Sequence, residues 1–219
     1  MLTPDLLSFT NIFVVGEPLT KTPHKLGRIS LDVDDTIAGV WRHVLGLHNA
    51  QSPTQYELMD IRDWNWRGTT MTTEQYYVLY NKVWHDMSHR IELLIDKKLL
   101  LKLTKHYEID IVTSRGNVPE LEATVAPLRK WLSKNGIGKF RLVISDELST
   151  KDVLGYDIYI DDSPVLARNI SKSDKKIMFL VDHPYNRDIE ESRNVKRVLD
   201  ANQALIALAD MAESGSKHK

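Results

Sequence analysis

The feature that most constrains this chain is a short apolar strand that runs directly into a pair of carboxylates. Ile29, Leu31 and Val33 occupy alternate positions, and this period of two predicts a buried strand. Asp32 and Asp34 lie where that strand ends. In open α/β sheets, ligands bind at the carboxyl ends of the strands. We therefore predict that Asp32 and Asp34 form a reaction centre.

Two other interpretations of this acidic segment deserve weighing. An Asp-rich turn with no function is common, so the pair by itself is a weak signal. A calcium-binding EF-hand loop would need glycine at its sixth position and glutamate at its twelfth, but Ile37 and His43 stand there. The EF-hand interpretation is excluded, and the choice between turn and reaction centre depends on the motifs further along the chain.

Four more apolar runs come after the first strand, and helical patterns separate most of them. Strands are predicted at residues 109–113, 140–144, 157–160 and 176–181, and helices at about 91–106, 119–134 and 198–211. Strands that alternate with helices favour right-handed crossovers and parallel pairing. The predicted fold is therefore α/β, a three-layer Rossmann-like, mostly parallel sheet.

Residues 39–90 interrupt this alternation because they contain no strand pattern. Apolar residues from Val40 to about Asn49 predict one helix, and Thr72 with Gln75 predicts the capping box of another. We interpret this block as a small helical cap inserted after the first strand. The predicted divisions are an N-terminal extension (1–27), an α/β core (28–38 and 91–212), the cap (39–90) and a flexible tail (213–219). The apolar residues 12–15 suit an edge strand or a docked arm.

Composition excludes several classes of function. The 29 basic and 30 acidic residues give a formal charge of -1, which provides no overall attraction to a polynucleotide or an anionic membrane. The absence of cysteine excludes disulfides, thiolate nucleophiles and thiolate zinc sites, and favours a cytoplasmic protein. No secretory signal and no membrane-spanning run is recognised. The oligomeric state, including a homo-oligomer, is left open.

The strand ends carry an ordered set of motifs that resembles a known superfamily. In chain order they are Asp32-Val33-Asp34-Asp35-Thr36, Val112-Thr113-Ser114, Lys151 and Ile160-Asp161-Asp162. This set, within about residues 28–181, resembles the haloacid dehalogenase superfamily of phosphotransferases. Within it the chain is most similar to the 5′(3′)-deoxyribonucleotidases, which carry a helical cap after the first motif. The turn His183-Pro184-Tyr185-Asn186-Arg187 also resembles a segment of those enzymes.

The resemblance implies a Mg²⁺-dependent phosphatase of (deoxy)nucleoside monophosphates that works through an aspartyl-phosphate. Asp32 would be the nucleophile and a metal ligand. Asp34 would transfer protons, with its backbone carbonyl facing the metal. Asp162 would complete the protein ligands, and Asp161 would orient the site or bind the metal through water.

The remaining motif residues would bind the phosphoryl group. The resemblance assigns this role to Thr113, Ser114 and Lys151. Lys139 also lies between the second motif and the paired acids, but Lys151 has the spacing of the nucleotidase segment.

The cap contains aromatic side chains that could stack on a nucleobase. The candidates for substrate contacts are Val40, Trp41, Trp64, Trp66 and Trp84. A small cap also needs bulky residues for its own core, so both roles stay open for these side chains. Alternative functions are a phosphatase of another small phosphomonoester or of polynucleotide 3′-phosphate ends, and a non-catalytic binding module. The expected partner is a small nucleotide, with no membrane, and a polynucleotide is the less favoured partner.

Overall fold

We describe a computed structural model of the chain, covering residues 12–15, 25–64, 69–115, 121–145 and 148–216. Its described part centres on one seven-stranded sheet. The strands are β1 (Ile12–Val15), β2 (Arg28–Leu31), β3 (Glu108–Ser114), β4 (Arg141–Ser145), β5 (Ile158–Asp161), β6 (Ile177–Val181) and β7 (Val195–Val198). Strands β2 to β7 run parallel, and β1 pairs antiparallel with β4 at one edge. The predicted mostly parallel sheet is confirmed, and of the two possibilities for residues 12–15 the structure shows the edge strand.

The strand order across the sheet is β1-β4-β3-β2-β5-β6-β7. From β2 the chain first adds β3 and β4 on one side, and then crosses over to add β5, β6 and β7 on the other. The winding therefore reverses at β2. Such a switch point leaves a crevice at the carboxyl ends of the strands, where ligands bind in open α/β sheets. Asp32 directly follows β2 and so lies at the switch point.

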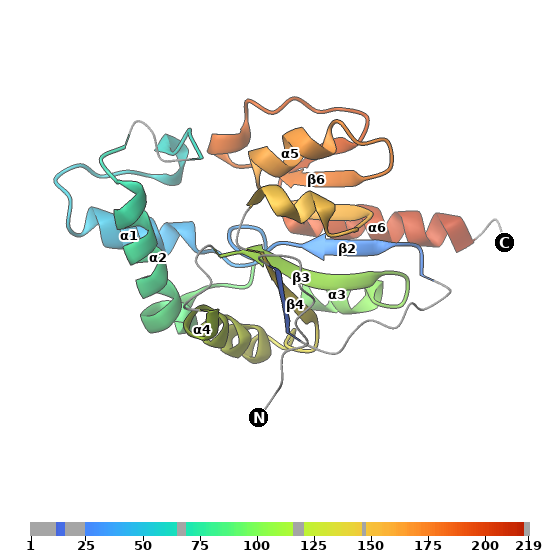
Figure 1. Cartoon of the computed structure of the whole chain (residues 1–219), viewed down its shortest axis with the longest axis horizontal. Helices are drawn as coiled ribbons and strands as arrows, with labels where there is room; N and C mark the ends of the chain where they lie inside the picture. Colours follow the sequence, from blue (N-terminus) through green and yellow to red (C-terminus); the bar gives the residue numbers. More distant parts are fainter. Residues whose placement is uncertain (1–11, 16–24, 65–68, 116–120, 146–147, 217–219) are drawn as a thin grey trace.

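Helices cover both faces of the sheet (Figure 1). One face carries α3 (Lys97–Leu103), α4 (Leu121–Lys134) and α6 (Ala201–Ser216), and the other carries α5 (Pro164–Ile170). Successive strand residues point to opposite faces, so Ile111 packs in the cluster on the first face and Val112 in the cluster on the second. The predicted three layers are confirmed.

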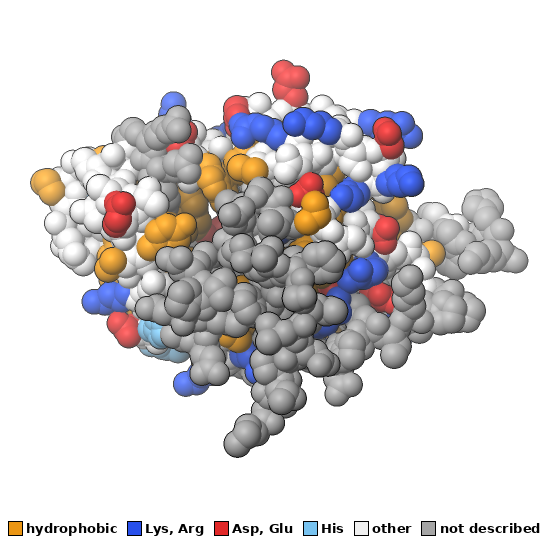
Figure 2. Space-filling model, viewed as in Figure 1, with side chains coloured by type: hydrophobic (Ala, Val, Ile, Leu, Met, Phe, Trp, Pro, Cys, Tyr) orange, Lys and Arg blue, Asp and Glu red, His pale blue; other side chains and the backbone are white. Residues whose placement is uncertain are grey.

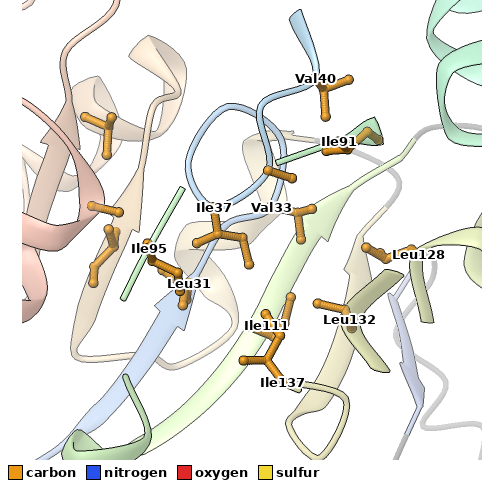
Figure 3. Close-up of a cluster of buried hydrophobic side chains, with 14 of the residues drawn as sticks. Leu31, Val33, Ile37, Val40, Ile91, Ile95, Ile111, Leu128, Leu132 and Ile137 are labelled. Carbon is orange, nitrogen blue, oxygen red and sulfur yellow. The ribbon is translucent and has the colours of Figure 1, made fainter. Parts of the chain in front are cut away.

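The larger cluster anchors the segment that leaves β2 (Figure 3). Leu31 of β2, Ile111 of β3 and Leu128 of α4 are fully buried there, as is Ile37 beyond the end of β2. Burial of side chains of this size contributes about 1.5–3 kcal/mol each. The apolar packing of Leu31 and Ile37 therefore holds the two ends of the loop that carries Asp34.

The described part of residues 39–90 contains helices and no strand, as predicted. It contains α1 (Trp41–Asn49), η1 (Leu58–Asp60), α2 (Thr73–Met87) and η2 (Ser88–Arg90). These elements lie beyond the carboxyl end of β2 (Figure 1). The capping box of α2 is confirmed, because Thr72 Oγ1 accepts from the Gln75 N–H at 3.2 Å and Gln75 Oε1 accepts from the Thr72 N–H at 3.0 Å. Trp84 of α2 meets Trp131 of α4 edge to face, with ring centroids 5.9 Å apart.

Several element bounds differ from the prediction. The helix predicted at 91–106 was wrong at its start: α3 begins at Lys97, because Asp96 caps it by accepting from the Lys98 N–H at 2.8 Å. Residues 195–198 pair with β6 as a strand, so α6 begins at Ala201. Helix α5 has only seven residues, too few for a periodic signal, although Ser163 and Pro164 form a typical helix start. No helix in the described ranges is long and apolar enough to cross a membrane.

The amino ends of the central strands hold a buried ion cluster, away from Asp32. Asp110 of β3 is 1% exposed and accepts from Arg141 through two nitrogens and from Tyr156 Oη at 2.7 Å. Arg28 Nη2 lies 3.5 Å from the same carboxylate, and its guanidinium lies over the Tyr156 ring. Glu108 Oε2 also lies 3.6 Å from Arg28 Nε, so two acids face two permanent cations, which is the pattern of a satisfied structural cluster.

We expect Asp110→Ala to lower the free energy of unfolding by about 3–5 kcal/mol, because removing one partner of a buried ion pair leaves the other without compensation. Urea denaturation would measure the change. Asp174→Ala, at an exposed position, is the control and should stay within about 0.5 kcal/mol of the wild type. An Asp110→Ala loss as small as that of the control would contradict a structural role for the cluster.

Candidate active site

The turn after β2 fixes where the first two acids lie. The N–H groups of Ile37 and Ala38 both donate to the Val33 carbonyl at 2.9 Å, which closes the turn tightly. Asp35 adopts a left-handed conformation with φ of 57°, which aspartate tolerates better than most residues. Its carboxylate accepts from the Trp41 N–H at 3.1 Å and so caps the start of α1. The turn therefore sets the direction in which the cap leaves the sheet.

Three carboxylates meet at the carboxyl ends of β2 and β5. Asp32, Asp161 and Asp162 are buried, and each offers an oxygen such that the three oxygens lie within 4.8 Å of one another. Lys151 of η4 (Leu148–Val153) reaches the same point from the segment after β4. Its Nζ donates to Asp32 at 2.5 Å and to Asp161 at 2.8 Å, and its side chain is 1% exposed. Four sequence-predicted residues are thus in one cluster.

The donor set suits a hard divalent cation. With all groups ionised, three carboxylates against one ammonium leave two uncompensated negative charges, and buried charge without compensation is costly. All three groups offer oxygen, the ligand that Mg²⁺ prefers. Asp161 already accepts from the Ser163 N–H at 2.9 Å and from Lys151, so its carboxylate is held in orientation by the protein. Asp32, Asp161 and Asp162 could therefore hold Mg²⁺.

Burial dominates the electrostatics of the cluster. It raises the pKa of Asp32 to about 7, although the Lys151 ammonium opposes the shift. Burial also raises the pKa of Asp162 well above its ordinary value, and the carboxylates of Asp32 and Asp161 add to the effect. For Lys151, burial disfavours the charge, but Asp161 and Asp32 outweigh it and raise its pKa. The electrostatics of the cluster therefore favour a bound cation.

Asp34 lies at the junction between the core and the cap. Thr113, near the end of β3, places its Oγ1 3.4 Å from Asp34 Oδ2, and Ser114 follows as the last residue of that strand. Thr113 is buried and Ser114 is half-buried. Lys139, the other candidate lysine, lies over the Phe140 ring at 5.9 Å instead of at the cluster. The roles assigned to these residues stay predictions.

Sequence reasoning missed two residues that contact Asp34. Tyr80 of α2 donates from Oη to Asp34 Oδ2 at 2.8 Å. Arg115, directly after β3, places Nη2 3.3 Å from the same oxygen, and its side chain is 1% exposed. The position of Arg115 immediately after the second motif was an available signal. Tyr80 carried no such signal, because 46 positions separate it from Asp34 and only the docking of the cap joins them.

An aromatic row links the core to the cap on the other side of the site. Tyr185, in η5 (Pro184–Asn186), stacks on Trp41 with centroids 4.7 Å apart and on His183 at 5.1 Å. Its hydroxyl donates to the Asp162 carboxylate. Trp64 meets the Tyr185 ring edge to face at 5.1 Å. The similarity of the turn at residues 183–187 to nucleotidases did not by itself predict the contact with Asp162.

The five predicted cap residues fall into different environments. Val40 is fully buried and Trp41 is 4% exposed, while Trp64 is half-buried. Trp84 is 2% exposed and donates from Nε1 to Asp34 Oδ1 at 3.0 Å. Trp66 lies outside the described residues. Trp64 is therefore the most accessible described member of the predicted set.

Comparison with known families decides the identity of the chain. Residues 27–211 match the family described as 5′ nucleotidase, deoxy (pyrimidine), cytosolic type C protein (NT5C). The chain belongs to the NT5C family. The resemblance expected from the motifs is confirmed, and with it the expectation of a phosphoric monoester hydrolase of the 5′-nucleotidase type.

No curated protein matches this NT5C family member. Among solved structures, it is similar to a haloacid dehalogenase-like family hydrolase from Xanthomonas campestris, at 12% identity and a TM-score of 0.48. That match covers 89% of this chain and 99% of the other.

The raised pKa of Asp32 predicts how the stability of the metal-free nucleotidase changes with pH. Between the ordinary value of 3.8 and about 7, the folded protein holds a proton that the unfolded chain has lost. Because the folded state then binds more protons, stability falls as pH rises, by up to about 1.4 kcal/mol per pH unit for one proton. We expect the free energy of unfolding in EDTA to show this decline between about pH 4 and pH 7.

Asp32→Asn provides the comparison for this measurement, because an amide does not titrate. Urea denaturation of both proteins across the pH range would give the difference between the two curves. We expect the wild type to lose stability relative to Asp32→Asn as pH rises. Parallel curves would contradict a raised pKa at Asp32.

Proposed function

We propose that this NT5C family member is a Mg²⁺-dependent phosphatase that hydrolyses deoxyribonucleoside monophosphates through an aspartyl-phosphate. The observation that carries the proposal is the buried cluster of Asp32, Lys151, Asp161 and Asp162 at the switch point of the sheet. The family description favours 5′ esters of pyrimidine deoxynucleosides as the first substrates to test, and its cytosolic type supports a cytoplasmic enzyme.

The first step forms a bond between an Asp32 carboxylate oxygen and phosphorus and breaks the bond from phosphorus to the leaving oxygen. Asp34, on the same turn, gives its proton to that oxygen as it departs. In the second step, water attacks phosphorus, Asp34 takes the proton, and the bond to Asp32 breaks. Inorganic phosphate leaves, and both carboxylates return to their starting states.

The transferring phosphoryl group carries negative charge on its equatorial oxygens, so an anionic nucleophile needs compensating cations and donors. Lys151 holds a fixed ammonium beside Asp32, and Thr113 and Ser114 offer hydroxyl groups at the end of the adjacent strand β3. Mg²⁺ bound by Asp32, Asp162 and the Asp34 carbonyl, with Asp161 orienting the site, would neutralise further charge and align the phosphate.

The formal net charge of -1 favours a small substrate over a polynucleotide. On the face drawn in Figure 2, basic and acidic side chains intermingle over the side that carries α5 and β6, and no continuous basic track is visible among the coloured residues. Polynucleotide binding depends on clustered Lys and Arg. This supports a mononucleotide over a 3′-phosphorylated strand end.

We expect the purified enzyme to release phosphate from deoxynucleoside 5′-monophosphates with Mg²⁺ and to lose this activity in EDTA. Asp32→Asn should abolish turnover, because an amide is a poor nucleophile and a poor Mg²⁺ ligand. A phosphate-release assay over nucleoside 5′- and 3′-monophosphates, sugar phosphates and a 3′-phosphorylated oligonucleotide would identify the substrate class. Near-normal turnover by folded Asp32→Asn would rule out the aspartyl-phosphate.

Trp64 is the cap side chain that we expect to contact the base, because it is half-buried beside Tyr185 at the edge of the site. Stacking of a base on an aromatic ring contributes about 1–3 kcal/mol, so Trp64→Ala should lower kcat/KM for a nucleotide by about 5- to 150-fold. Deoxyribose 5-phosphate, the same ester without the base, should respond much less. Tyr77→Ala, at an exposed position on α2, is the control. Equal losses for both substrates would argue against stacking.

A further inference from the structure

The Asp34 carboxylate is held from two sides by hydrogen-bond donors. From cap helix α2, Tyr80 Oη donates to Oδ2 at 2.8 Å and Trp84 Nε1 donates to Oδ1 at 3.0 Å. From the core, Thr113 Oγ1 lies at 3.4 Å and Arg115 Nη2 at 3.3 Å from Oδ2. Tyr80 and Trp84 are four positions apart and so share one face of α2. The shortest contacts to this core carboxylate therefore come from the cap.

Arg115 ties the two cap residues together. Its guanidinium lies 4.3 Å from the centre of the Trp84 ring and 5.5 Å from that of Tyr80, within the range of cation–π attraction. The same guanidinium contacts Asp34. Among the described residues, nothing accepts from its Nε or Nη1, although both atoms are buried. The contacts of this cation are thus directed at Asp34 and the two rings that bind it.

The position of α2 is fixed by contacts with the core below it. Trp131 of α4 meets Trp84 edge to face and donates from Nε1 to the Ile91 carbonyl at 3.0 Å. Lys134, also on α4, donates to the His89 carbonyl at 3.0 Å, just beyond the end of α2. These bonds join the exit of the cap to the core. Tyr80 and Trp84 are therefore held at a defined distance from Asp34.

We propose that Tyr80 and Trp84 are positioning residues that orient Asp34 for proton transfer, so that α2 serves the chemistry as well as covering the site. The proposal rests on the proposed function, in which Asp34 is the proton donor and acceptor. Both residues act through Asp34 and contact neither the phosphorus nor the base in this role. Trp84 then orients Asp34 through its indole N–H and does not need its ring face to bind the base.

The two donors differ in what they can do during the reaction. An indole N–H only donates, so Trp84 stabilises the ionised carboxylate that accepts a proton from water. A phenol both donates and accepts, so Tyr80 can stay bonded to Asp34 whether or not that carboxyl carries its proton. The Tyr80 hydroxyl, at 2.8 Å, therefore suits both steps.

The positioning role predicts that the loss of activity in a variant depends on the leaving group of the ester. A weakly basic leaving oxygen, such as that of 4-nitrophenyl phosphate, departs without a proton, whereas a sugar or phenyl oxygen needs the proton of Asp34. If Asp34 is wrongly oriented, the rate of hydrolysis should therefore fall more for esters whose leaving oxygen is more basic. Loss of base stacking would instead slow nucleotides alone, and loss of folding would slow every ester equally.

The experiment compares kcat/KM, which reports the steps up to departure of the leaving group, for para-substituted phenyl phosphates, deoxyribose 5-phosphate and a deoxynucleoside 5′-monophosphate. Tyr80→Phe keeps the ring and removes one oxygen, and Trp84→Phe removes the N–H. With Mg²⁺ present, we expect each to lose about 10- to 100-fold on phenyl and deoxyribose phosphates, a part of the full contribution of general acid catalysis. The kcat/KM for 4-nitrophenyl phosphate should change little.

Two reference variants make the result decisive. Tyr77→Phe removes a hydroxyl from an exposed position on the same helix and should keep the wild-type dependence on the leaving group. Asp34→Asn should show the steepest dependence. The positioning role is wrong if Tyr80→Phe and Trp84→Phe both keep the wild-type dependence on the leaving group while Asp34→Asn does not. It is also wrong if the two variants lose activity on nucleotides alone, or on all esters equally. A wild type that hydrolyses none of these esters would overturn the proposed function, and this proposal with it.

Discussion

The burial of three carboxylates beside a single ammonium is the constraint on which the rest of this structure depends. Asp32, Asp161 and Asp162 are brought together because β2 and β5 are neighbours at the point where the sheet reverses its winding. Lys151 offsets part of the charge from the segment after β4. The apolar faces of the strands supply the stability that lets the fold retain an arrangement of charges that is unfavourable by itself.

The cap is joined to this centre through the acids themselves. Helix α2 reaches Asp34 through Tyr80 and Trp84, and α1 reaches Asp162 through the stack of Trp41 on Tyr185. Asp35 adds a third link, because its carboxylate caps α1. A cap attached in this way cannot shift without disturbing the groups that would perform the chemistry. The cap and the candidate catalytic groups are thus mechanically connected in this fold.

The two ends of the sheet differ in charge balance. At the amino end, Asp110 and Glu108 face Arg141 and Arg28, so two negative charges meet two positive ones. At the carboxyl end, acids outnumber the cations that neighbour them. The first arrangement is complete within the protein and stabilises the strands. The second is suited to a cation from solution, which supports its proposed role as the functional end.

The sequence by itself determined the strands other than β7, the cap insertion and the motif acids. Apolar alternation with a period of two marks a strand and its end, so the residue pattern alone places Asp32, Asp34 and the Asp161-Asp162 pair at one edge of the sheet. Two short elements were not predicted, because the seven residues of α5 and the four of β7 carry too little periodicity. Only the tertiary structure decided that Tyr80, Trp84 and Arg115 meet at Asp34, and that Tyr185 meets Asp162. Those contacts span 23 to 81 positions and depend on how helices and loops dock, which no local pattern of residues encodes.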